Sequence, residues 1–185
     1  TYYFDPSTAR SVKWARTIDG ADYYFNGNGQ MVTGPVRWKS DGTTSVFASN
    51  GKMVTSGWAK ANGATYFVSS NTKRAVKWQQ KIGDYWYYFD GNCKMQTGWV
   101  KWNGVREWSY FDSNGRRVSG TQKIGDQTFK FDSNGRTKTE PITMPAAQRE
   151  MLERAQHFSS DTSWLILVDR DTRHVGIFRG SEGNW

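Results

Sequence analysis

A short aromatic motif that recurs at nearly regular intervals constrains this chain more than any other feature of its sequence. The motif ends in phenylalanine at seven successive places, with steps of 21, 22, 20, 22, 22 and 20 positions between them. A tryptophan follows most copies ten to thirteen positions later. Two markers that keep one period indicate tandem copies of a single supersecondary unit. The phenylalanines are Phe4, Phe25, Phe47, Phe67, Phe89, Phe111 and Phe131, and the tryptophans are Trp14, Trp38, Trp58, Trp78 and Trp99.

Tight-turn dipeptides separate the two markers. Asn-Gly follows the aromatic motif, as at Asn28–Gly29, and Asp-Gly or Asn-Gly follows the tryptophan, as at Asp19–Gly20. These dipeptides supply the positive φ angles that tight hairpin turns need. Short alternating strands between turns favour β structure over helix. Each repeat is therefore predicted to be a β-hairpin. A lone hairpin is barely stable in water, so the repeats are predicted to stack into a mainly β fold, a β-solenoid.

The composition of the chain changes at residue 140. Residues 1–140 hold 25 of the 29 aromatic residues and no leucine, and their 20 Lys and Arg against 11 Asp and Glu give a net charge of +9. Residues 141–185 hold all three leucines, and their 5 Arg against 6 Asp and Glu give a net charge of −1. We therefore predict a repeat region at 1–140, a helical linker or cap at 141–160, and the truncated start of a second domain at 161–185.

Two local patterns support the division after residue 140. Apolar residues recur at helical spacing behind Pro145, from Met144 to Phe158, which predicts a helix of about 14 residues. The runs Trp164–Val168 and His174–Phe178 flank a polar turn and predict a separate β-hairpin. Because the chain starts at Thr1 and stops after a turn-like segment, it is expected to be a fragment or a processed form.

Several functional classes are disfavoured. The longest apolar run has five residues, far short of a membrane span. The single cysteine, Cys93, excludes an internal disulfide and a multi-cysteine metal site, and no nucleophile is accompanied by a base. The basic residues are scattered singly, which is unlike a nucleic-acid-binding surface. The chain is predicted to be non-catalytic, without cofactor or metal. Cys93 stands where other repeats have glycine, so we expect backbone strain there and interpret it as tolerated drift.

Four segments carry a resemblance to a known family: Trp86–Asp90, Met95–Trp99, Trp108–Gly115 and Gly29–Gly34. Together they read as Gly-Trp, then Trp-Tyr-Tyr-Phe-Asp, then Asn-Gly-x-Met-x-Thr-Gly. This pattern resembles the cell-wall-binding, choline-binding repeats of Gram-positive surface proteins, relatives of which occur in clostridial toxins and glucan-binding proteins. The resemblance extends over the repeat region, 1–140. It implies a secreted protein held at the cell surface by choline-decorated teichoic acid, peptidoglycan or glucan.

The resemblance also implies how a ligand is held. In that family the Trp of Gly-Trp, the first Trp of the next Trp-Tyr-Tyr and a neighbouring aromatic form a cage for the quaternary ammonium of choline. A cation over such a ring gains about 0.5 to 2 kcal/mol. The other repeats depart from the pattern, so at most two cages are expected, and Trp14, Trp38 and Trp58 are interpreted as packing between hairpins. The candidate cage residues are Trp78, Trp86 and Tyr88 for one site, and Trp99, Trp108 and Tyr110 for the other.

Three functions stay open at this point. The first is a non-catalytic wall-binding module. The second follows from residues 161–185, which look like the opening strands of an L,D-transpeptidase catalytic domain. The chain would then be the targeting arm of a peptidoglycan-crosslinking enzyme whose catalytic residues lie beyond it. The third is a glucan- or carbohydrate-binding module, in which aromatic rings stack on sugar rings.

Overall fold

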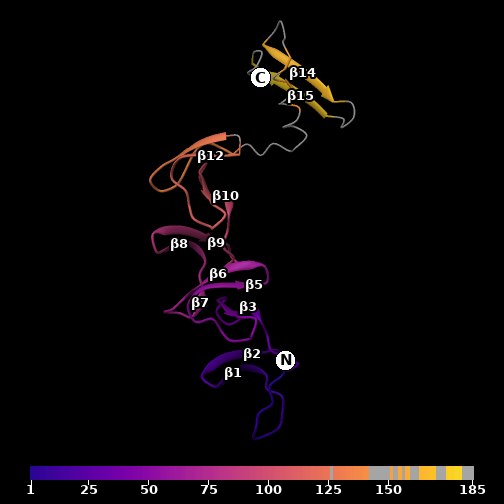
Figure 1. Cartoon of the computed structure of the whole chain (residues 1–185), viewed down its shortest axis with the longest axis vertical. Coiled ribbons are helices and arrows are strands. Elements are labelled where there is room, and N and C mark those ends of the chain that lie inside the picture. The colour runs from indigo at the N-terminus through magenta and orange to yellow at the C-terminus, as the bar shows by residue number, and fades with distance from the viewer. Residues whose placement is uncertain are drawn as a thin grey trace. The chain divides into compact units, whose positions relative to one another are not determined.

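The described residues form many short antiparallel strands, joined by turns, and very little helix (Figure 1). Its computed structural model describes residues 1–125, 127–141, 151, 154–155, 157–158, 163–169 and 174–180. The chain forms two compact units, Thr1–Glu140 and Pro141–Trp185.

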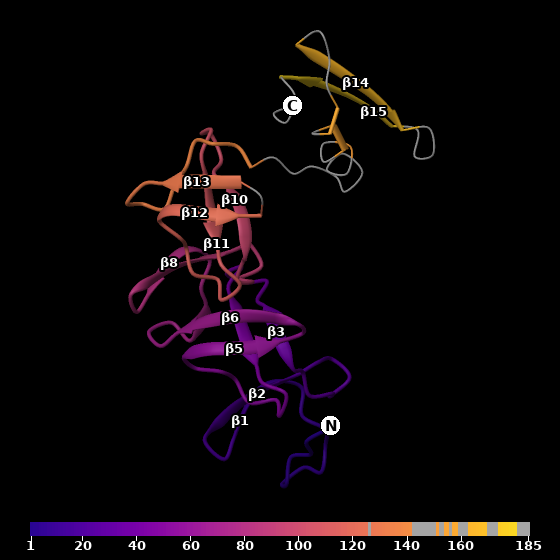
Figure 2. The ribbon, with the colours of Figure 1, turned by 45° about the horizontal axis from the view of Figure 1, so that its top comes forward.

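Six antiparallel hairpins make up the described part of the first unit, and they follow one another in chain order (Figures 1 and 2). Five form sheets of their own, and β7 (Arg74–Ala75) adds a third strand to the remaining one. The prediction of tandem β-hairpins is confirmed, whereas their winding into a solenoid stays a prediction. The hairpins are β1 (Trp14–Ile18) with β2 (Ala21–Phe25), β3 (Gly34–Arg37) with β4 (Thr44–Phe47), β5 (Gly57–Ala61) with β6 (Ala64–Ser69), β8 (Trp78–Ile82) with β9 (Tyr85–Phe89), β10 (Gly98–Lys101) with β11 (Trp108–Phe111), and β12 (Gly120–Ile124) with β13 (Gln127–Phe131).

The two kinds of turn are built differently. In the loop between β1 and β2, Asp19 and Gly20 have φ angles of 49° and 75°, as a two-residue hairpin loop requires. Between hairpins, an Asp or Asn side chain organises the turn. The Oδ1 atom of Asp112 accepts hydrogen bonds from the backbone N–H groups of Asn114 and Arg116, at 2.9 and 2.8 Å.

Each of these between-hairpin segments directly follows one hairpin, and backbone hydrogen bonds tie it to the hairpin before that one. The N–H of Met95, which follows β9, donates to the carbonyl of Thr65 in β6 at 2.8 Å. The N–H of Arg117, which follows β11, donates to the carbonyl of Trp86 in β9 at 2.8 Å. Neighbouring hairpins are therefore joined by backbone bonds as well as by side-chain packing.

Most of the phenylalanines that end the aromatic motifs form the core. Phe25, Phe47, Phe89, Phe111 and Phe131 are at most 3% exposed.

Two of the seven phenylalanines do not lie in the core. Phe4 is 59% exposed. Phe67 is only half-buried, because Gly57 pairs with Val68 instead, and Val68 takes the core position. A slip of one residue exchanges the two faces of a strand.

Cys93 keeps the backbone of the glycine it replaces, with a φ of 64°, so the expected strain is present. Its side chain is buried in a cluster with Tyr66, Val68 and Ala75. Its Sγ lies 3.6 Å from the carbonyl oxygen of Ala75. At the equivalent turn, a Cβ on Gly115 would meet a methionine instead. The thiol therefore fills a core position beside a small neighbour, and tolerated drift is only part of the explanation.

The second unit contains β14 (Trp164–Asp169) paired with β15 (His174–Arg179). The predicted hairpin is therefore present. Met151, Arg154 and Ala155 are helical, and the remaining residues of the predicted helix lie almost entirely outside the described residues. Met151 and Ala155 are buried.

Substitution of Gly115 tests how the turns are packed. A Cβ at Gly115 would lie 2.5 Å from Sδ of Met95, whereas a Cβ at Gly98, with nearly the same φ, would meet nothing within 4 Å. We expect Gly98→Ala to lower the free energy of unfolding by about 1–2 kcal/mol through positive φ alone. Gly115→Ala should cost about 1–3 kcal/mol more, because the core is overpacked.

Urea denaturation of a double-mutant cycle separates the two effects. In a Met95→Ala background, Gly115→Ala should cost no more than Gly98→Ala does, since the steric partner is gone. An undiminished cost in that background would contradict the role given to Met95.

Tyr66 yields a second prediction, on pH dependence. Its hydroxyl is buried with no hydrogen-bond partner among the described residues. Burial, followed by the charges of Asp90 and Cys93, raises the pKa of Tyr66 above its ordinary value of 10.0. The unfolded chain therefore loses this proton first as the pH rises past about 10, and stability should fall from there upward.

Tyr66→Phe should leave the free energy of unfolding at pH 7 unchanged or raise it by about 1 kcal/mol, because an unsatisfied group is removed. The same variant should flatten the alkaline loss of stability in denaturation curves measured from pH 8 to 11. Tyr23→Phe is the control, and a flattening of equal size there would count against the prediction.

Candidate ligand-binding pocket

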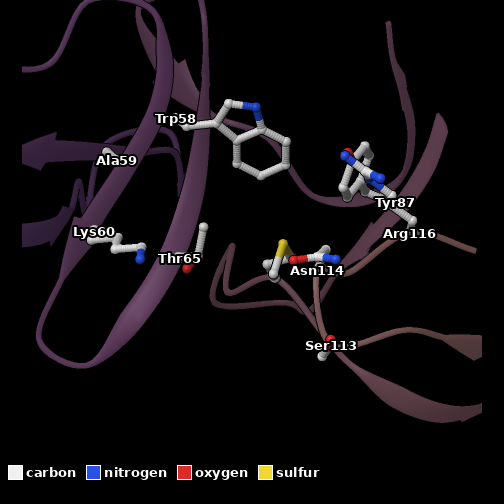
Figure 3. A pocket seen from close by; sticks show the side chains of 9 residues that line it. Trp58, Ala59, Lys60, Thr65, Tyr87, Ser113, Asn114 and Arg116 are labelled. Atoms are coloured by element: carbon white, nitrogen blue, oxygen red, sulfur yellow. The ribbon is translucent and has the colours of Figure 1, made fainter. Parts of the chain in front are cut away.

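A surface pocket of about 440 Å³ lies between the hairpins β5–β6 and β8–β9 and the turn that follows β11 (Figure 3). It combines an aromatic wall with polar and basic side chains from three different parts of the first unit. The lining residues are Trp58, Ala59, Lys60, Thr65, Tyr87, Met95, Ser113, Asn114 and Arg116.

Trp58 and Tyr87 form the aromatic wall. Trp58 stands opposite Phe67 across the β5–β6 ladder, and its ring meets Phe67 edge-on at 5.1 Å. Tyr87 comes from β9 of the next hairpin, and its ring meets Trp58 at 4.9 Å and 65°. Trp58 is nevertheless 45% exposed, so part of its ring faces the pocket. The same ring joins two hairpins and presents a binding surface.

The polar side of the pocket is basic. Arg116 places its guanidinium 4.2 Å from the ring centre of Tyr85. A hydrogen bond with the side chain of Tyr87 is the main reason that the pKa of Arg116 is raised. Lys60 reaches the pocket from β5, and Thr65 and Asn114 add neutral polar groups. No Asp or Glu is among the lining residues.

A second pocket, of about 420 Å³, repeats much of this arrangement earlier in the chain. Five of its lining residues precede their counterparts by 64 positions, which is the length of three hairpins. Its backbone repeats too, since the N–H of Met31 donates to the carbonyl of Thr1 at 2.8 Å, as Met95 does to Thr65. The matching residues are Thr1, Tyr23, Met31, Ser49 and Asn50 in one pocket, and Thr65, Tyr87, Met95, Ser113 and Asn114 in the other.

The first set of candidate cage residues is on the hairpin β8–β9. Trp78 is 56% exposed and contacts Tyr88, with ring centres 6.3 Å apart. Trp86 lies instead beneath the guanidinium of Arg117, 5.1 Å from its ring. Among the described residues, Trp78 and Trp86 make no ring contact with each other. The chain's own cation covers Trp86, which is one of the three expected cage walls.

The second set behaves in a similar way. Trp99 meets Tyr110 at 5.1 Å, and it also packs on Phe129 of the next hairpin at 4.6 Å. Trp108 is only 5% exposed, and the ammonium of Lys101 lies 5.3 Å from its ring centre. The structure brings Trp99 and Tyr110 together and leaves little of Trp108 for a ligand.

The sequence patterns did not single out Trp58, which they assigned to packing only, or Tyr87, Lys60 and Arg116. One signal could have distinguished the tryptophans. Gly57 precedes Trp58 as Gly98 precedes Trp99, whereas Trp14 and Trp78 follow lysines.

The ladder registers explain this difference. Trp14 and Trp78 stand opposite Phe25 and Phe89, in the place that Gly98 takes opposite Phe111. Their φ angles are 68° and 62°, in the region glycine prefers. They are therefore not equivalent to Trp58 and Trp99, although the repeat spacing alone groups them together.

Among the described residues, no group of three or more His, Cys, Asp or Glu side chains is placed to hold a metal ion. In the same part of the chain, no helix is long and apolar enough to cross a membrane.

Curated relatives match the chain over part of their length. Glucosyltransferase-I of Streptococcus downei is 30% identical over 126 residues, which cover 63% of this chain and 8% of that protein. Glucosyltransferase-S of Streptococcus mutans is 31% identical over 119 residues, covering 60% of this chain and 8% of that protein. The chain thus spans about 8% of the length of these relatives.

Solved structures share the fold. CbpF in complex with ipratropium is 28% identical, with a TM-score of 0.56, and the match covers 74% of this chain and 41% of that one. CbpJ from Streptococcus pneumoniae is 20% identical with the same TM-score, over 74% of this chain and 51% of that one. Residues 12–58 and 76–119 match the choline-binding repeat family. The hairpin repeats within these two stretches are therefore similar to choline-binding repeats.

Proposed function

We propose that this chain is a non-catalytic module that binds bacterial cell-wall polymer through aromatic-walled pockets between its hairpins. The observation that carries the proposal is the pocket beside Trp58, together with its recurrence 64 positions earlier in the chain. Such a pocket offers ring faces and a few polar groups, which is the usual composition of a small-ligand site.

Two classes of ligand fit an aromatic wall. A quaternary ammonium over a ring gains about 0.5 to 2 kcal/mol, and the family match and the likeness to CbpF favour choline on teichoic acid. A sugar ring can stack on the same face, and the glucosyltransferase relatives favour glucan or another glycan. The predicted cages at Trp78, Trp86 and Tyr88, and at Trp99, Trp108 and Tyr110, stay part of the choline proposal.

The charge of the first unit supports attachment to an envelope polymer. Residues 1–140 carry a net charge of +9, which attracts anionic polymers such as teichoic acid from solution. We propose that the module holds a secreted protein at the cell surface, with wall polymer as its partner. We also propose that its hairpins stack as a solenoid, so that pockets recur along one unit.

The targeting arm of an L,D-transpeptidase stays a proposal for the longer protein. It rests on the sequence resemblance of residues 161–185, to which the hairpin β14–β15 adds only the pairing of the two strands. The parent reading frame tests this proposal directly. A Ser-x-Gly-Cys segment within about one domain length after Trp185 supports it, and a stop codon there rejects it.

Trp58→Ala tests the proposed pocket. Loss of this ring should weaken retention on purified cell walls by about 5- to 30-fold, the equivalent of 1–2 kcal/mol. Trp14→Ala is the matched control, because Trp14 is 57% exposed and lines neither pocket.

Retention is measured in a pull-down with free choline or with an oligosaccharide as competitor, and the competitor that displaces the protein identifies the ligand class. Equal losses for Trp58→Ala and Trp14→Ala would sink the assignment of this pocket.

Arg117→Ala tests whether the chain's own cation closes the expected cage at Trp86. Removal of the guanidinium should leave that ring face open, so that choline titration produces a larger change in tryptophan fluorescence than in the parent protein. This larger fluorescence change should disappear in the double variant Arg117→Ala, Trp86→Ala.

Lys101→Ala is the control for this prediction, because Trp108 is buried and its exposure should change little without the lysine. A choline response that is identical in all these variants would reject the cage at Trp86 while leaving the pocket at Trp58 untouched.

A further inference from the structure

We infer that the pocket beside Trp58 binds an anionic saccharide, meaning a sugar ring that carries a phosphate or carboxylate group. The inference rests on the proposed function, because it names the class of wall component that this pocket takes. It follows from the charge of the lining, from the exposed part of the Trp58 ring, and from a comparison with equivalent positions elsewhere in the chain.

Two basic side chains reach the pocket from different elements. Lys60 projects from β5 and Arg116 from the turn after β11, and Figure 3 shows them on opposite sides of the pocket. None of the lining residues is acidic. A quaternary ammonium that entered would approach two like charges, whereas an anionic group would be attracted by both.

Neither Lys60 nor Arg116 forms an ion pair with a carboxylate within the part of the chain that the structure describes. The ion pairs there join Arg16 to Asp5 and Arg136 to Glu107. The guanidinium of Arg116 lies over the ring of Tyr85. A guanidinium over a ring still presents N–H donors at its edge, and those donors match the oxygens of a phosphate or carboxylate.

Part of the ring of Trp58 is uncovered, as are parts of the rings of Trp14 and Trp78, but of these three only Trp58 lines the pocket. Cations of this chain lie over Trp86, Trp102 and Trp108. Among the described residues, no Lys or Arg lies over Trp58, which is 45% exposed. An apolar ring face bordered by Thr65 and Asn114 suits a sugar, which has an apolar face and hydroxyl groups around its edge.

Two lysines provide matched controls. Lys123 holds the same place in the hairpin β12–β13 that Lys60 holds in β5–β6, and each stands opposite a threonine. Lys52 precedes Arg116 by 64 positions and follows the equivalent glycine. Neither control lysine lines either aromatic pocket. The pairs Lys60 with Arg116 and Lys52 with Lys123 therefore carry equal charge in equivalent surroundings and differ in their access to the pocket.

The experiment measures affinity for glucose 6-phosphate, glucuronate, glucose and choline by NMR titration of the full chain. We expect the two charged sugars to bind more tightly than glucose or choline. Lys60→Gln combined with Arg116→Gln should weaken the charged sugars by about tenfold. Lys52→Gln combined with Lys123→Gln should have little effect. Comparison of the affinities for glucose 6-phosphate and glucuronate shows whether the pocket prefers a phosphate or a carboxylate group.

The same variants are tested for retention on purified cell walls, which separates the two proposals. If the parent chain is not retained on walls, the proposed function fails. If the parent chain is retained but glucose binds as tightly as the charged sugars, or both double variants lose equal affinity, only the anionic saccharide is rejected. Tighter binding of choline than of either charged sugar would overturn the inference in the same way.

Discussion

Packing of aromatic rings between neighbouring hairpins is the interaction on which the first unit depends. No sheet in its described part has more than three strands, so hydrogen bonding within sheets cannot hold the hairpins together. Ring packing does so, alongside the backbone bonds that segments such as the one at Met95 make to another hairpin. Tyr24 meets Trp38 of the next hairpin at 5.0 Å, and Tyr88 meets Trp102 at 5.4 Å, both nearly perpendicular. Such edge-to-face pairs add about 0.5–1.5 kcal/mol to the effect of burial.

The same rings give the unit its binding surface. Trp58 and Tyr87 both line the pocket, and their rings contact each other. Tyr87 is only 7% exposed, whereas Trp58 is 45% exposed, so one part of the Trp58 ring packs on Tyr87 and another part faces solvent. Binding and stability are therefore linked at this place. A ligand on Trp58 lies directly on the junction between two hairpins.

Basic side chains have two different roles in this unit. Arg117 covers the ring of Trp86 and shields aromatic surface from water, and Lys101 lies over the ring of Trp108, which is already buried. Lys60 and Arg116 line an open pocket, and Arg116 also lies over the ring of Tyr85. The net positive charge of residues 1–140 is thus divided between covering rings and lining a site. A count of charges cannot distinguish these roles, since each depends on which ring lies next to which basic side chain.

Local signals were enough to predict the hairpins and their turns, because Asn-Gly and Asp-Gly pairs and alternating aromatics act within a single repeat. They also indicated that Cys93 would take a strained glycine conformation. Which ring faces where was settled by packing between hairpins. Val68 replaced Phe67 in the core through the ladder register, and Trp58, interpreted as packing, came to line a pocket. Ring contacts between hairpins join residues that lie in different repeats, 14 or more positions apart. A repeat pattern treats equivalent positions as equal even when their neighbours differ.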